Sequence, residues 1–70
     1  MKPESRLEIA RRRVAVAEAE VLRQKLIVED LQKSGHPAQG SIILLGLMQQ
    51  SLETFRKSLA LMEEHNPGSN

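Results

Sequence analysis

The 70-residue sequence has no cysteine, no tryptophan and no tyrosine, and it has a single phenylalanine. The absence of cysteine excludes disulfides and thiolate-ligated metals, which reinforce many very small proteins. A chain of this size rarely gains more than about 3 to 5 kcal/mol from a single core. We therefore expect this chain to be reinforced by oligomerisation.

Long apolar runs and a strong excess of one charge are also absent. The longest apolar stretch, 42–48, is far shorter than the roughly 20 residues that cross a bilayer, and it contains Gly46. No apolar segment typical of a secretory signal follows Met1, so we expect a cytoplasmic protein. Ten basic and nine acidic residues leave a net charge of +1, which is weaker than the basic excess usual in nucleic-acid-binding domains.

What the sequence does contain is the periodicity of two amphipathic helices. In the second half, apolar residues recur at spacings of three and four: Leu45, Met48, Leu52, Phe55, Leu59 and Met62. In the first half, two heptad positions carry a matching stripe, one with Leu7, Val14, Val21 and Val28 and the other with Ala10, Ala17, Gln24 and Leu31. We call these positions of both helices the seam. They predict an all-α fold, an antiparallel helical hairpin of two helices whose seams bury each other.

Local signals place the ends of the helices. We expect one domain, 1–70, with the first helix at about 4–34, a break at 35–37, the second helix at about 38–65 and a frayed tail at 66–70. Pro3 suits the first helical position, and Ser5 with Glu8 matches a capping box. Gly35 suits the left-handed residue that ends a helix.

The start of the second helix decides how the two seams pair. Either the helix starts at Pro37, or Ser41 caps a later start. A start near Pro37, which we favour, sets Val21 near Met48, whereas a cap at Ser41 shifts the pairing by one heptad.

Apolar residues continue outside the seam, on faces that the neighbouring helix of a hairpin cannot reach. Exposed apolar area of this extent marks an interface. A second copy is the simplest cover, so we expect a homodimeric four-helix bundle; a complex with another helical protein and a higher assembly are the alternatives. The residues expected in self-association are Val14, Val16, Val21, Leu22, Leu26, Ile27, Ile43, Leu45, Leu47, Met48, Leu52, Phe55, Leu59 and Leu61.

Three polar features have a functional and a structural interpretation. The basic run Arg11–Arg13 is expected to be a solvated face partly neutralised by Glu63 and Glu64; the alternative is a phosphate-binding patch of an RNA-binding hairpin dimer. His36 in the break is expected to be a loop residue, with a pH-sensitive contact as the alternative. Gln24 is expected at the edge of the seam with its amide in water; a buried glutamine paired with its symmetry mate is the alternative.

Candidate catalytic or metal-binding groups do not assemble. His36 and His65 are expected about one helix length apart, roughly 40 Å, too far to share a metal within one chain. The serines have no histidine within reach on the same face, and no glycine-rich phosphate loop exists. We therefore expect no catalytic residues, no cofactor, no metal and no enzymatic activity.

The segment 22–36 resembles a known pattern. It matches Arg-Gln-x-x-Ile-Val-x-x-Leu-x-x-x-Gly-His from Arg23 to His36, and the second helix matches Leu-Leu-x-x-Met-x-x-Ser-Leu from Leu44 to Leu52. Over about residues 16–62, the chain therefore resembles a group of short, uncharacterised helical-hairpin proteins of rhizobia and related alphaproteobacteria. The resemblance implies a cytoplasmic bacterial hairpin and carries no activity.

These features together predict a small non-enzymatic interaction or regulatory module. It is expected to act through self-association and protein–protein contacts, with no membrane partner. The residues expected to contact a further partner are Arg11, Arg12, Arg13 and His36.

Overall fold

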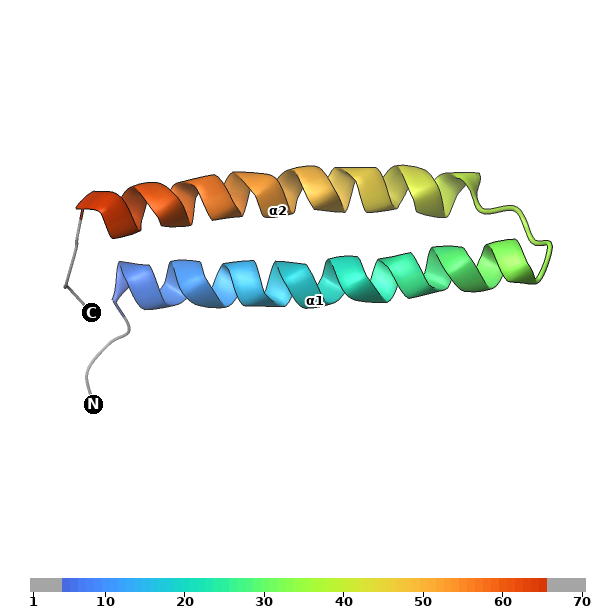
Figure 1. Ribbon diagram of the computed structural model, residues 1–70, viewed down its shortest axis with the longest axis horizontal. Coiled ribbons are helices and arrows are strands. Elements are labelled where there is room, and N and C mark those ends of the chain that lie inside the picture. The colour runs from blue at the N-terminus through green and yellow to red at the C-terminus, as the bar shows by residue number, and fades with distance from the viewer. Residues whose placement is uncertain (1–4, 66–70) are drawn as a thin grey trace.

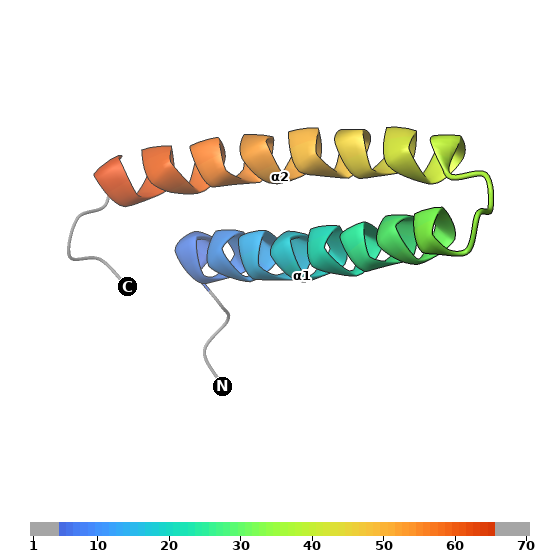
Figure 2. The ribbon, with the colours of Figure 1, turned by 45° about the vertical axis from the view of Figure 1, so that its right-hand side comes forward.

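The computed structural model describes residues 5–65, which form two long α-helices joined by a short turn. Helix α1 spans Arg6–Lys33 and helix α2 spans Gln39–His65. The helices run antiparallel and side by side, so that the start of α1 and the end of α2 lie at one end of the hairpin (Figures 1 and 2). The described residues contain no strand. The predicted all-α hairpin is therefore confirmed.

Helix α1 begins with the capping box that the sequence predicts. The Ser5 hydroxyl accepts a hydrogen bond from the Glu8 N–H, and the Ser5 N–H donates to Glu8 Oε1, both at 3.1 Å. These two bonds satisfy backbone donors that a helix start otherwise leaves without partners. The expectations for Pro3 and for the tail at 66–70 lie outside the described residues.

The turn between the helices is closed by backbone hydrogen bonds. The Ser34 N–H donates to the Asp30 carbonyl at 3.0 Å, and the His36 N–H donates to the Leu31 carbonyl at 2.9 Å. Gly35 has φ 72°, so the predicted left-handed residue is confirmed. The Ala38 carbonyl accepts from Ile42 N–H at 2.9 Å, so α2 starts between the two positions that the sequence suggested.

The core is thin and lies along the seam. Its central cluster contains Val14, Val21 and Leu52, and Ala17, Leu45, Met48 and Leu59 pack against it. Met48 therefore shares a cluster with Val21, as a start of α2 near Pro37 predicts. The buried apolar residues of the described chain are Leu7, Val14, Val21, Val28 and Leu52.

Gln24 is buried, and the expectation that its amide lies in water was wrong. Its side chain is only 7% exposed, and Nε2 donates to the Ser41 carbonyl oxygen at 3.0 Å. A buried amide needs such an acceptor, because an unpaired polar group in a core costs stability. The bond joins the last third of α1 to the first turn of α2, and it resists sliding of one helix along the other.

We expect Gln24→Ala to lower the free energy of unfolding by about 1 to 3 kcal/mol, because it removes this bond and leaves a cavity. Gln24→Leu, which keeps the volume and removes only the bond, should cost less. Urea unfolding followed by circular dichroism measures both changes. Equal stability of Gln24→Ala and the natural chain would contradict this role of the amide.

The capping box also makes a prediction about pH. Two hydrogen bonds lower the pKa of Glu8 from its ordinary value of 4.5. The bond from the Ser5 backbone has the larger effect, and the bond with the Ser5 side chain adds to it. A carboxylate with a lowered pKa stabilises the folded chain above its unfolded pKa, and that stability is lost as the pH falls through the folded pKa. We expect the first turn of α1 to fray below pH 4.5. An NMR titration should show the pKa of Glu8 rising part of the way toward 4.5 in Ser5→Ala, which removes the hydroxyl and keeps the backbone N–H; an unchanged pKa would contradict a contribution of the hydroxyl.

Candidate interaction surface

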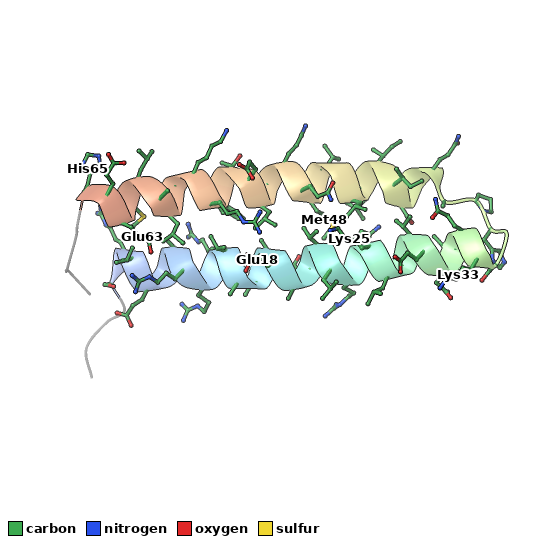
Figure 3. The ribbon with its side chains drawn as sticks, viewed as in Figure 1. Glu18, Lys25, Lys33, Met48, Glu63 and His65 are labelled. Atoms are coloured by element: carbon green, nitrogen blue, oxygen red, sulfur yellow. The ribbon has the colours of Figure 1, made fainter. Side chains whose placement is uncertain are left out.

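One face of the hairpin carries two ion pairs between the helices. Arg11 pairs with Glu63 at 3.5 Å, and Arg56 pairs with Glu18 at 2.9 Å. The two pairs are one heptad apart on each helix, so their side chains lie on the same side of the seam, and Figure 3 labels both glutamates. We call this side the ion-pair face. Leu22 and Lys25 belong to it, because they line a shallow cavity together with Glu18 and Arg56.

The other side of the seam is hollowed by a groove between the helices. Two adjoining cavities of about 590 and 380 Å³ share the lining residues Ile9, Arg13 and Phe55, so they form one continuous groove. None of their lining residues lines the cavity of the ion-pair face. We call this side the groove face. Its lining residues are Arg6, Ile9, Ala10, Arg12, Arg13, Val16, Ala17, Glu20, Met48, Ser51, Thr54, Phe55, Ser58 and Met62.

The groove follows from the side chains that the seam uses on this side. At one seam position α1 carries valines and a leucine that are buried, whereas at the other it carries Ala10 and Ala17, which line the groove. An alanine leaves most of the space of a larger side chain empty. Phe55, the single aromatic residue, lines both cavities and stays 37% exposed although it belongs to the seam. The seam therefore leaves more space on the groove face than on the ion-pair face, whose cavity measures about 400 Å³.

Charges on the groove face differ from those on the ion-pair face. Arg13 and Glu20 both line the groove, two helical turns apart. Within residues 5–65 neither of them forms an ion pair or a hydrogen bond through its side chain. The four charges of the two ion pairs are compensated within the hairpin, and these two are not.

Exposed apolar side chains are abundant on the described helices. Ten large apolar side chains are between 37% and 65% exposed, twice the number of buried ones. They are Val16, Leu22, Leu26, Ile27, Ile42, Ile43, Leu44, Leu47, Phe55 and Leu61. Ile42 and Leu44 are exposed as well, although they are not among the residues expected in self-association.

The predicted self-association set divides into three groups. Val14, Val21 and Leu52 are buried between the two helices of one chain, where a second copy cannot touch much of their surface. Leu45, Met48 and Leu59 are partly buried against that cluster. The members that a second chain can reach fully are Val16, Leu22, Leu26, Ile27, Ile43, Leu47, Phe55 and Leu61.

The predicted partner contacts point in different directions. Arg11 pairs with Glu63, as the sequence analysis expected for the neutralised end, while Arg12 and Arg13 line the groove. The basic run is thus divided between two faces of the hairpin. His36 is exposed in the turn, at the end far from these arginines.

Among residues 5–65, no three histidine, cysteine or acidic residues come close enough to hold a metal ion. In the same range, neither helix has the length and apolar character that crossing a membrane requires. The chain matches no family model, no curated protein and no solved structure. The surface itself is therefore the basis for inferring function.

Proposed function

We propose that the protein is a small non-enzymatic interaction module that acts through self-association into a four-helix bundle. The observation that carries this proposal is the imbalance between ten large exposed apolar side chains and five buried ones. Solvated apolar area of this extent is unfavourable by roughly 25 cal/mol per Å². Covering it with a second hairpin recovers that free energy and doubles the core.

The thinness of the core supports the same proposal. None of the described side chains is less than 2% exposed, and α2 contributes only Leu52 to the buried set. A hairpin with so few buried side chains gains little stability alone, and small helical proteins commonly gain the rest by association. A cytoplasmic location and the likeness to short rhizobial hairpin proteins are compatible with this role, and both stay predictions.

Sedimentation velocity tests the self-association directly. We expect a concentration-dependent species with twice the 7.9 kDa mass of one chain. Because association stabilises only the folded chain, the unfolding temperature should rise with protein concentration. A single species of 7.9 kDa throughout the micromolar range would overturn the proposal.

An RNA-binding hairpin dimer is the second candidate, because Arg6, Arg12 and Arg13 line one groove. Against it, Arg11 is turned away to Glu63 and only one aromatic side chain is available to stack on bases. We expect no binding of a single-stranded or duplex RNA probe at physiological salt. Micromolar binding that weakens steeply with salt and disappears in the double variant Arg12→Ala, Arg13→Ala would favour the second candidate instead.

A further inference from the structure

We infer that two copies of the chain pack groove face to groove face, about a two-fold axis that crosses α1 beside Ala17 and α2 beside Leu52. This inference rests on the proposed self-association and names its surface and its symmetry. In such a dimer α1 lies against the partner's α1 and α2 against the partner's α2, each pair antiparallel.

The charges of α1 fit this symmetry. An antiparallel pair of identical helices brings Arg13 opposite the partner's Glu20 when the axis passes midway between these two residues, between Val16 and Ala17. The symmetry then creates the same pair twice. Both side chains line the groove, and neither has an ion-pair partner among residues 5–65 of its own chain. The second copy therefore supplies the compensation that the hairpin lacks.

A row of side chains on the outer side of α2 has the same kind of symmetry. Its members are Leu44, Leu47, Ser51, Thr54, Ser58 and Leu61. Its members recur at alternating spacings of three and four residues, and Ser51, Thr54 and Ser58 line the groove. The row reads the same in both directions about a point between Leu52 and Glu53. An axis there places Leu44 opposite the partner's Leu61.

These two midpoints coincide in the folded hairpin. Leu52 forms one buried cluster with Val14 and Val21, which stand three residues before and four residues after Ala17 on α1, so the midpoint on α1 and the midpoint on α2 lie close to one level. The buried hydrogen bond of Gln24 supports this register. Gln24 lies one heptad after Ala17, and its acceptor Ser41 lies in the turn before Leu45, which is one heptad before Leu52. One axis therefore satisfies both helices, although the charges of α1 and the row of α2 are independent features.

The interface has apolar ends and a centre of small side chains. Leu44 and Leu61 are 47% and 56% exposed in the single hairpin and would cover each other at both ends of the α2 row. Ser51 and Thr54 oppose each other at the axis, where small side chains let helices approach closely. The Thr54 hydroxyl donates to the Gln50 carbonyl at 3.1 Å, so this donor is already satisfied within its own helix.

The ion-pair face is less suitable for the same role. The four side chains of its two ion pairs are each about half exposed and already paired. Burying them under a second copy would remove their hydration without adding a partner, which costs free energy. The groove face also carries Arg6 and Arg12, but it offers the larger groove, exposed leucines and, in Arg13 and Glu20, opposite charges without an ion-pair partner among residues 5–65.

Charge reversal tests this interface. Arg13→Glu sets two pairs of like charges against each other across the axis, and Glu20→Arg does the same with the opposite sign. We expect each single variant to weaken the dimer by about tenfold to a hundredfold in sedimentation equilibrium. The double variant Arg13→Glu, Glu20→Arg restores both pairs and should return to within about threefold of the natural affinity.

Mixing the two single variants gives the sharpest readout. One chain then presents two glutamates and the other two arginines at these positions, so a heterodimer should form in preference to both homodimers. Lys25→Glu makes the same charge change on the ion-pair face and is the matched control, expected to leave the affinity unchanged. Circular dichroism confirms that each variant keeps its helices.

The outcomes separate this inference from the proposed function. If the natural chain dimerises and the reversals at positions 13 and 20 act no more strongly than the control, the inferred interface is wrong and self-association stands on another face. If the natural chain stays monomeric, the proposed function fails. Recovery of affinity in the double variant and in the mixture supports the interface.

Discussion

A hairpin of two helices has one seam, and this constraint governs the whole molecule. Only the side chains between the helices can be buried, whereas the apolar residues of this chain extend well around both helices. Five apolar side chains are buried and ten large ones are exposed. The hairpin is folded by its seam, and its surface is determined by what the seam leaves uncovered. The surplus is the physical reason for proposing self-association.

The two sides of the seam differ because the residues of α1 differ in size. Branched side chains such as Val14 and Val21 are buried and leave one cavity of about 400 Å³ on the ion-pair face, whereas Ala10 and Ala17 leave the larger groove on the other side. The ion-pair face also carries the internal ion pairs, so these four charges are already compensated within the hairpin. The groove face carries Phe55. The alternation of small and large side chains at the seam positions of α1 thus leaves the larger space between the helices on the groove face.

Heptad periodicity and local caps were enough to predict the hairpin, the capping box of Ser5 and Glu8, and the left-handed Gly35. The placement of Gln24 could not be predicted, because its burial depends on an acceptor at Ser41 that is close only after folding. The groove was missed for a related reason: Ala17 belongs to an apolar stripe whether or not it fills its space. The opposed charges of Arg13 and Glu20 were visible in the sequence, but their significance requires knowing that no partner lies within the hairpin.

The most direct test of dimerisation through the groove face is an isotope-filtered NOE spectrum of a mixture of labelled and unlabelled chains, which detects only contacts between copies. The account predicts intermolecular contacts between the methyl groups of Leu44 and those of the partner's Leu61. It also predicts that the ring of Phe55 contacts the partner's Ser51; its phenyl signals are assigned easily, because the chain has one phenylalanine and no tyrosine or tryptophan. Intermolecular contacts confined to Leu22 and other residues of the ion-pair face would contradict the account.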